Sequence, residues 1–293
     1  MYFLFKISMI AATIIGGNAG AYQDNVVQTC PSTIQAMKQD DYNESVSTNQ
    51  KDSLIVLLDS YFNNEKRKTK AGALISIHYK WNQKDYGGYS KWGEAFRQKG
   101  AATRITIDPP SKKVLRDASI YIITDPDIPS ENSNAKYMTP EFAETIARWV
   151  SNGGVLVLMA NDSGNADIKH FNLLTQKFGF RFNEDSYNHV PGNNFDLGAV
   201  NIAAGNPIFK QTRHVYIKEL STITTFGQGQ VRPILEKQGR IIAVSTHYGK
   251  GVVFAVGDPW FYNEYVNGRL PDSFENVKAM KELTNWLVSI AGK

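Results

Sequence analysis

The chain has 293 residues, of which 42% are hydrophobic and 20% charged, a composition typical of a folded globular protein and not of a disordered or fibrous one. Its formal net charge of +4 is too small to indicate a protein that binds nucleic acid or anionic membranes. The single cysteine, Cys30, excludes an internal disulfide, so the fold must be held by its hydrophobic core.

The first 21 residues have the pattern of a secretory signal peptide. Lys6 precedes the apolar stretch ISMIAATII, and small residues ending at Ala21 follow it. The apolar stretch is too short to span a bilayer, so we expect cleavage after Ala21 and a periplasmic or secreted protein. Residues 22–50 are polar without a sustained period, which predicts a leader or loosely packed arm, and we expect the folded domain over residues 51–293.

Four apolar runs, each followed by Asp or Asn, predict the strands of a parallel sheet. They are residues 53–60, 119–127, 155–163 and 251–258. Continuous apolar runs of this length are typical of strands that are buried on both faces. We therefore expect helices to cover both sides of the sheet.

Helical patterns lie between these runs. Residues 90–100 and residues 139–154 are each expected to form a helix, the second with a threonine N-cap. A third helix is expected to end at Gly179, and a fourth follows Asp272 and Glu275, which have the spacing of a capping box. Alternating strands and helices predict parallel strand pairing.

Together these elements predict one α/β domain. After Gly179, residues 214–226 and residues 232–256, with the turn signals Gln238-Gly239 and Gly249-Lys250-Gly251, predict antiparallel hairpins added to the edge of the sheet. The basic run at residues 65–70 is interpreted as a solvated loop.

The strand ends predict a site for sugars. Ligands of such sheets bind beyond the carboxyl ends of the parallel strands, and the loops there mix aromatic and carboxamide side chains. A pyranose stacks its C–H face on an aromatic ring and pairs its hydroxyls with Asp, Asn and Glu. The predicted binding residues are Asp59, Asn63, Asn64, Glu65, Tyr89, Trp92, Asp125, Asp127, Asn161, Asn193, Asn194, Trp260 and Asn263.

These predictions have structural alternatives. Asp and Asn also cap helices and form turns wherever a strand finishes. Trp92 and Trp260 are expected to stack on sugar faces, and the alternative is that both fill the core beneath a loop. Lys91, Arg97 and Arg269 are candidate partners for a ligand carboxylate.

Catalysis stays open. Cleavage of a glycosidic bond needs one protonated and one ionised carboxyl group, and Asp258, Glu264 and Asp162 are the candidates. A nucleophilic Ser163 is disfavoured because the residues beside it are not small enough for a nucleophile elbow.

No cofactor and no metal site are predicted. The five histidines lack paired zinc spacing, and no glycine-rich phosphate loop follows the first strand. Residues 161–167 offer oxygen ligands but lack the distal Glu of an EF-hand, so a divalent cation there remains open.

Several long strings, among them LLDSYFNNE, YSKWGEAFRQKGA, GGVLVLMANDSGNADIKHFNLLTQKFGFRFNE and YGKGVVFAVGDPWFYNEY, resemble a known family. It is the glutamine-amidotransferase-like (flavodoxin-like) companion domain of unsaturated rhamnogalacturonyl hydrolases, associated with glycoside hydrolase family 105, of Bacteroidota. The resemblance covers about residues 51–290. It implies an acidic ligand, an unsaturated uronyl oligosaccharide derived from rhamnogalacturonan or pectin.

The resemblance implies no catalytic residue for this chain. The family's hydrolytic groups belong to a separate (α/α)₆ barrel, which has no counterpart in this sequence. The amidotransferase fold implies a cysteine nucleophile after a central strand, and the matching string LMANDSGN has none, so glutaminase activity is not expected. The alternative function is a non-catalytic interaction module that docks on a barrel hydrolase or on itself.

Overall fold

The computed structural model describes residues 54–227 and 230–292. The expected signal peptide at residues 1–21 and the expected arm at residues 22–50 lie outside these ranges. Among the described helices, none combines the length and the apolar character that crossing a bilayer requires.

In the described part of the chain, nine strands form the main sheet. They are β1 (Ile55–Asp59), β4 (Ala102–Thr106), β5 (Ile120–Thr124), β6 (Val155–Met159), β7 (Phe180–Phe182), β10 (Ile223–Thr225), β11 (Val231–Lys237), β12 (Arg240–Tyr248) and β13 (Gly251–Val256). The order is β4-β1-β5-β6-β13-β12-β10-β7, with β11 paired to β12. The strands from β4 to β13 are parallel, and the remaining pairings are antiparallel.

The strand order reverses between β1 and β5. The chain passes from β1 outward to β4, returns to β5 on the other side of β1, and continues to β6 and β13. This is the flavodoxin-like order, in which ligands bind at the carboxyl ends of the strands beside the reversal. The predicted fold class is confirmed: a mainly parallel α/β sheet with an antiparallel extension.

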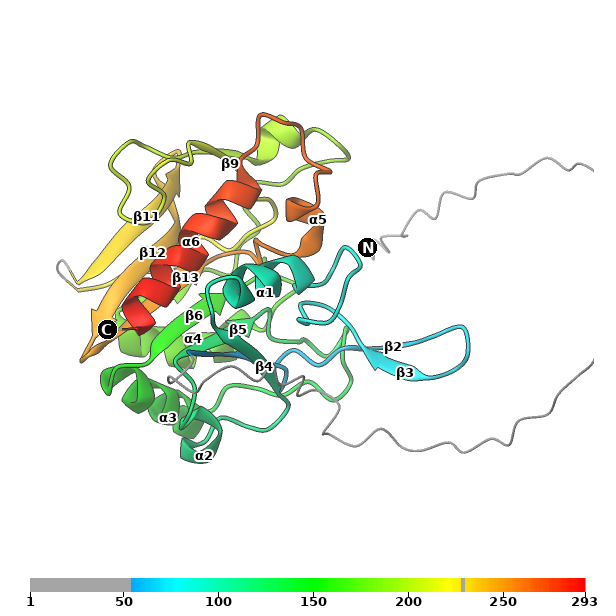
Figure 1. Cartoon of the computed structure of the whole chain (residues 1–293), viewed down its shortest axis with the longest axis vertical. Helices are drawn as coiled ribbons and strands as arrows, with labels where there is room; N and C mark the ends of the chain where they lie inside the picture. The colour runs from blue at the N-terminus through cyan, green and yellow to red at the C-terminus, as the bar shows by residue number, and fades with distance from the viewer. Residues whose placement is uncertain (1–53, 228–229, 293) are drawn as a thin grey trace, which may run out of the picture. The chain divides into compact units, whose positions relative to one another are not determined.

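Helices cover both faces of the sheet (Figure 1). One face carries α1 (Ser90–Arg97) and α6 (Asn276–Ala291), and the other carries α2 (Lys112–Leu115), α3 (Pro140–Ser151) and α4 (Ile168–Thr175). Alternate residues of each strand enter the two cores: Val56 and Leu58 pack on the side of α1, and Leu57 packs on the side of α3. Because both faces are buried, the strands read as continuous apolar runs.

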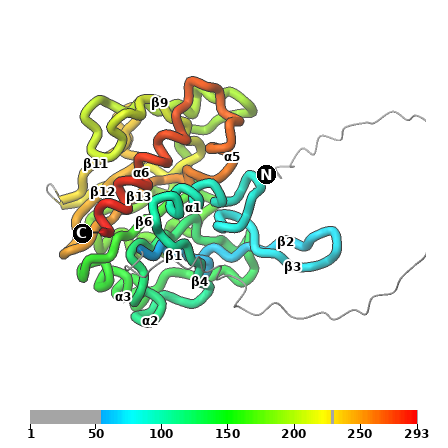
Figure 2. Tube along the Cα trace, in the orientation of Figure 1, coloured from blue at the N-terminus to red at the C-terminus, as the bar shows by residue number. Residues whose placement is uncertain are grey.

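The shorter elements lie in the connections. They are β2 (Lys66–Lys68), β3 (Leu74–Ser76), the 3-10 helices η2 (Gln176–Phe178) and η3 (Phe195–Gly198), β8 (Ala199–Asn201), β9 (His214–Tyr216) and α5 (Asn263–Val266). The β2–β3 hairpin extends away from the helices and the main sheet, as the chain trace shows (Figure 2).

The structure confirms one predicted helix start and contradicts another. Thr139 caps α3 as predicted, since its hydroxyl accepts the Phe142 backbone N–H at 3.2 Å. The capping box predicted for Asp272 and Glu275 is wrong, because α6 begins at Asn276. The Glu275 carboxylate instead accepts the backbone N–H of Arg213 at 2.6 Å. This hydrogen bond ties the start of α6 to the residue before β9.

The hairpin turn predicted at Gln238-Gly239 joins β11 to β12, and both residues have positive φ, 50° and 75°, as a two-residue hairpin turn of this kind requires. Two other predictions need correction. The segment His214–Tyr216 pairs with β8 in a separate two-stranded sheet and does not join the main one. The basic run at residues 65–70 contains strand β2 of an exposed hairpin, not a loop.

Candidate functional site

A groove of about 530 Å³ lies at the carboxyl ends of β1 and β5, where the strand order reverses. We call it the switch-point groove. The loop after β1, the loop after β5, the residue after β4 and the β2–β3 hairpin form its walls. Its lining residues are Tyr61, Asn64, Lys66, Leu74, Ile107, Glu131, Asn132, Ser133, Asn134 and Lys136.

A second hollow, of about 320 Å³, lies against α2 and α3, where Leu115 and Trp149 form part of its wall. It is smaller, and its lining comes from helices and not from strand ends. We place the candidate site in the switch-point groove, because there the loops that follow two adjacent parallel strands meet above a buried polar network.

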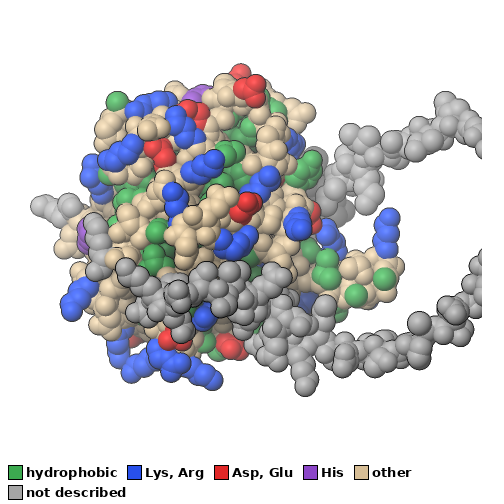
Figure 3. All heavy atoms as spheres, viewed as in Figure 1, with side chains coloured by type: hydrophobic (Ala, Val, Ile, Leu, Met, Phe, Trp, Pro, Cys, Tyr) green, Lys and Arg blue, Asp and Glu red, His purple; other side chains and the backbone are tan. Residues whose placement is uncertain are grey.

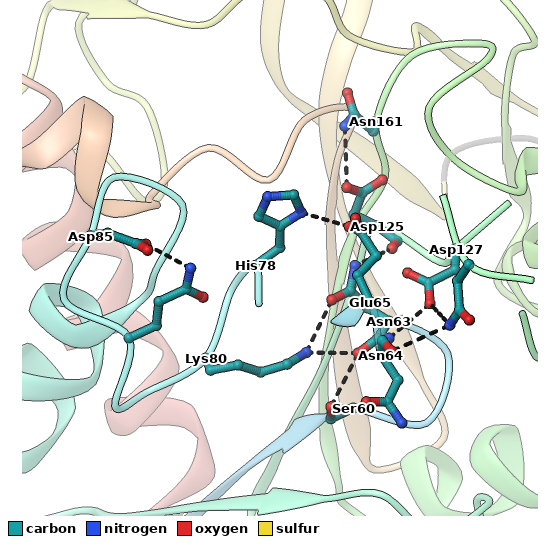
Figure 4. Close-up of polar contacts among 12 residues, drawn as sticks. Ser60, Asn63, Asn64, Glu65, His78, Lys80, Asp85, Asp125, Asp127 and Asn161 are labelled. Carbon is teal, nitrogen blue, oxygen red and sulfur yellow. Dashed lines mark hydrogen bonds and ion pairs between the residues drawn. The ribbon is translucent and has the colours of Figure 1, made fainter. Parts of the chain in front are cut away.

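Lys80 is the centre of that network (Figure 4). Its side chain is buried, and its Nζ donates to the backbone oxygen of Asn63 at 2.7 Å and to the Asn63 Oδ1 at 3.0 Å. The Asn63 amide nitrogen donates to the Asp125 carbonyl at 2.7 Å, which ties the loop after β1 to the loop after β5. Burial lowers the pKa of Lys80 to about 8. The negative charges of Asp59 and Asp127 act in the other direction and raise it.

Asp127 joins the two walls of the groove from below. Its Oδ2 accepts the Asn64 backbone N–H at 2.8 Å and the Asn132 amide at 2.5 Å. In the described structure its buried Oδ1 has no hydrogen-bond partner. Burial raises the pKa of Asp127, because an ionised carboxylate is poorly solvated there.

Asp59 closes the turn after β1. Its Oδ2 accepts the Tyr121 hydroxyl at 2.6 Å, and its Oδ1 accepts the backbone N–H groups of Tyr61 at 3.0 Å and Phe62 at 2.8 Å. Burial raises the pKa of Asp59 to about 6, although these hydrogen bonds and the charge of Lys80 lower it. Both carboxylate oxygens are therefore occupied within the protein.

Strained backbone lies around the network. His78, Tyr79 and Asp125 have positive φ values of 60°, 53° and 45°, in the left-handed region that favours glycine. Such conformations cost energy and persist where the surrounding structure fixes them, often at functional sites. Asp125 accepts the Asn161 amide through Oδ2 at 3.3 Å, and burial holds the pKa of Asp125 well above its usual range.

One titratable pair lies beside the buried network without lining the groove, and a single carboxyl group lines it. His78 Nδ1 is 2.6 Å from Glu65 Oε1, which is hydrogen-bonding distance. Glu131 lines the groove and is open to solvent. Crowding by protein atoms and the nearby charges of Glu65 and Asp127 raise the pKa of Glu131 to about 7.

The predicted convergence of strand ends is present. Because β1, β5, β6 and β13 are parallel neighbours, Asp59, Asp125, Asp162 and Asp258 lie along one edge of the sheet. Of the predicted binding residues, Asn64 lines the groove, and Asn63, Glu65 and the Asp127 carboxylate belong to the network below it.

The aromatic residues predicted to bind sugar need correction. Trp92, Trp260 and Tyr89 are each 0% exposed, so none offers a ring face to a ligand in this structure. Their polar atoms are used internally: the indole N–H of Trp92 donates to Thr284 Oγ1 at 3.1 Å, and the Tyr89 hydroxyl donates to the Pro259 carbonyl at 2.7 Å. These rings fill the core beneath the loops.

Asn263 also has a structural position. Its buried amide donates to the carbonyls of Gln83 and Asp85 at 3.1 and 2.8 Å, and its Oδ1 accepts the Lys91 backbone N–H at 3.2 Å. The neighbouring Glu264 forms an ion pair with Arg269. Asn263 therefore holds the loop before α1 against the segment after β13, and the Glu264 carboxylate is paired within that segment.

The remaining predicted acids differ from one another. Asp162 is buried and accepts Asn165 and Ser186 at 2.5 Å each, so its carboxylate closes the loop after β6. Asp258 is 4% exposed, and its Oδ1 has no hydrogen-bond partner among the described residues. Burial holds the pKa of Asp258 well above its usual range.

Asn193 and Asn194 lie on an exposed turn before η3 and do not line the groove. Of the candidate cations, Arg97 donates to Thr103 Oγ1 at 3.1 Å, and neither it nor Lys91 lines the groove. Within residues 54–227 and 230–292, no cluster of three or more His, Cys, Asp or Glu side chains is placed to hold a metal ion.

Sequence reasoning missed most of the groove wall. No sequence motif marks Tyr61, Lys66, Glu131 or Lys136. Residues 130–136, SENSNAK, have the composition of a polar loop. The topological rule could have found them, because it selects the loops after the two strands beside the reversal. It required knowing that β4 lies outside β1, and β4 was not predicted.

Comparison with known proteins supports the fold. The N-terminal domain of mmIFT52 matches with a TM-score of 0.61 and 15% identity, over 80% of this chain and 97% of that one. Cytoplasmic protein STM1381 from Salmonella typhimurium LT2 matches with a TM-score of 0.52 and 15% identity, over 80% and 98%. At such identities the likeness shows a shared α/β fold alone.

A GMP synthase-like protein from Thermoplasma acidophilum also matches, with a TM-score of 0.46 and 9% identity over 82% of this chain and 94% of that one, too low a score to support an argument. No protein-family model and no curated protein matches the chain. The α/β fold expected from the family resemblance is thus present, and the narrower relation to the rhamnogalacturonyl hydrolase companion domain is a proposal.

Proposed function

We propose that this chain binds an acidic oligosaccharide in the switch-point groove, of the unsaturated uronyl kind derived from rhamnogalacturonan or related pectin. The composition of the groove wall carries the proposal. An aromatic ring, amide and hydroxyl side chains, and two cations line one hollow: Tyr61, Asn64, Asn132, Asn134, Ser133, Lys66 and Lys136.

Each of these groups matches one part of a uronyl sugar. Tyr61 supplies the apolar face on which a pyranose ring stacks. Amides and a hydroxyl donate to and accept from sugar hydroxyls. Lys66 comes from β2 and Lys136 from the loop after β5, so a carboxylate between these segments gains charge-assisted hydrogen bonds.

The alternative, a docking module, would need an apolar surface that the groove does not explain. The β2–β3 hairpin carries exposed hydrophobic side chains beside basic ones (Figure 3). Leu74 is 63% exposed and Ile107 is 57% exposed, and both line the switch-point groove. Ile75 of the hairpin, 40% exposed, does not line the groove, but the two most exposed side chains beside it fit a ligand site, and we favour sugar binding over docking.

The experiment is titration calorimetry of the purified chain with unsaturated uronyl oligosaccharides prepared from rhamnogalacturonan. Lys66→Gln and Lys136→Gln should each weaken binding about tenfold, because each removes one charge-assisted contact. Lys281→Gln on α6 is the matched control, since this exposed lysine does not line the groove, and it should leave the affinity unchanged.

Neutral oligosaccharides of the same length test the charge requirement. They should bind more weakly than the acidic ones, and the affinity for the acidic ones should fall as salt is raised. The proposal fails if the acidic oligosaccharides do not bind, or if the groove variants and the Lys281→Gln control bind them equally well.

A further inference from the structure

The β2–β3 hairpin holds a concentration of positive charge that the overall charge of the chain conceals. Residues 66–76, KRKTKAGALIS, contain four basic residues and no acidic one. The formal net charge of the whole chain is +4, so the remaining residues are neutral in sum. The hairpin extends away from the main sheet (Figure 2), and all of its strand residues are exposed. A local field of one sign on an exposed segment attracts a ligand of the opposite sign.

The two faces of the hairpin differ in composition. In an antiparallel pair, opposed residues project from the same face, and successive residues along a strand project from opposite faces. Three pairs of opposed residues form the ladder: Lys66 and Ser76, Arg67 and Ile75, and Lys68 and Leu74. The first and third pairs therefore share one face, and the second pair lies on the other.

The face that holds Lys66, Lys68, Leu74 and Ser76, which we call the lysine face, is turned toward the switch-point groove. Lys66 and Leu74 line the groove. The Ser76 hydroxyl donates to Oδ1 of Asn64, another groove residue, at 3.4 Å. Lys68 follows Lys66 on this face and does not line the groove, so it extends the row of cations from the groove toward the turn of the hairpin.

The opposite face is turned away from the groove. Neither Arg67 nor Ile75 lines the groove, and Arg67 forms an ion pair with Asp85 at 3.4 Å. Within the described chain, by contrast, no carboxylate lies within ion-pair distance of Lys66 or Lys68. The cations of the lysine face are therefore open to the carboxylates of a ligand.

We propose that the lysine face is a second binding segment for the acidic oligosaccharide, through which the protein selects long chains that have a carboxylate on more than one sugar. The inference rests on the proposed function, because one part of the chain must occupy the groove. It adds a site outside the groove and a preference for chain length.

The geometry of the strand allows one chain to reach both lysines. Lys66 and Lys68 are two residues apart, roughly 7 Å along the strand, and project from the same face. Once a chain is held in the groove, its contact with Lys68 is intramolecular and costs little further translational entropy. Affinity should therefore rise with chain length until the chain covers Lys68, and then level off.

The test is titration calorimetry with size-fractionated unsaturated uronyl oligosaccharides from rhamnogalacturonan, from the disaccharide upward. Long chains should bind about tenfold more tightly than the disaccharide, and Lys68→Gln should remove this difference. Lys66→Gln should weaken the binding of short and long chains alike, since Lys66 lines the groove.

Arg67→Gln is the matched control, because it removes one charge from the same strand on the opposite face. The Arg67 and Asp85 side chains are 58% and 51% exposed, and an ion pair of this kind contributes little to stability. The variant should fold and should bind short and long chains as the wild type does.

Hydrogen exchange gives a second measurement of the same contact. The strands of the hairpin pair with each other and with no other strand in the described chain, and a two-stranded ribbon is only marginally stable. A long chain on the lysine face should slow the exchange of amides in residues 66–76, and the disaccharide should not. Lys68→Gln should reduce this protection.

The outcomes separate the two proposals. Equal affinity for the disaccharide and for long chains would overturn this inference and leave the proposed function standing. A preference for long chains that Lys68→Gln leaves intact, or that Arg67→Gln reduces equally, would also overturn it. Absence of binding at every length would remove the proposed function and this inference with it.

Discussion

Replacement of Asp59 by Asn tests whether this strand-end carboxylate is structural. Asp59 is 2% exposed, and its two oxygens accept Tyr121, Tyr61 and Phe62. An amide of the same shape keeps the oxygen that accepts the two backbone N–H groups, so Asp59→Asn should fold. The variant removes the ionisation and little else.

The expected magnitude follows from the pKa of Asp59. Burial raises this pKa from 3.8 to about 6, so between these values the unfolded chain releases the proton while the folded chain keeps it. Unfolding then releases protons, and the free energy of unfolding falls as pH rises through this window. The difference corresponds to about 3 kcal/mol, fully lost above about pH 6.

The assay is urea unfolding of both proteins from pH 3.5 to pH 7. The stability of Asp59→Asn relative to wild type should rise by about 3 kcal/mol across this range. Tyr121→Phe should extend the pH window upward, because the Tyr121 hydrogen bond lowers the pKa of Asp59. Asp117→Asn, at an exposed carboxyl, is the control. A constant difference between Asp59→Asn and wild type would refute the reasoning.

Three further predictions concern other parts of the chain. Trp92→Ala should lower the free energy of unfolding by about 3–5 kcal/mol in urea without changing the ligand affinity of the folded protein, because the ring is in the core. Gly88→Ala should lower the melting temperature measured by circular dichroism, since its Cβ would lie 1.9 Å from the Gln83 carbonyl oxygen. If residues 1–21 are a signal peptide, the mass of the exported protein should correspond to an N-terminus at Tyr22.

The sheet could be predicted because burial constrains its sequence. A strand covered on both faces must be apolar throughout, so residues such as Val56 and Leu57 read alike although they enter different cores. β4 escaped prediction because its pattern is half polar: Thr103 and Arg104 remain partly or fully exposed at the edge of the sheet. Without β4, the reversal beside β1 could not be located.

The site was less predictable, since the same residue types serve two purposes. Asp59 and Asn63 follow a buried strand because the turn there leaves backbone groups that need partners, and a short polar side chain supplies them. Trp92 gave a false signal for a similar reason: a large ring with one polar atom fits a buried position when that atom finds an acceptor, as it does at Thr284.

The groove depends on an insertion between β1 and α1. Residues 60–89 separate these elements and contain the β2–β3 hairpin, whose strands pair with each other and with no other strand in the described chain. The hairpin supplies Lys66 and Leu74 to the groove wall, and the segment after it supplies Lys80 to the buried network. Because the insertion adds nothing to the main sheet, its sequence needs no long apolar run followed by Asp or Asn, the pattern by which the other strands were predicted. The part of the chain that builds the candidate site is for this reason the part that sequence patterns describe least.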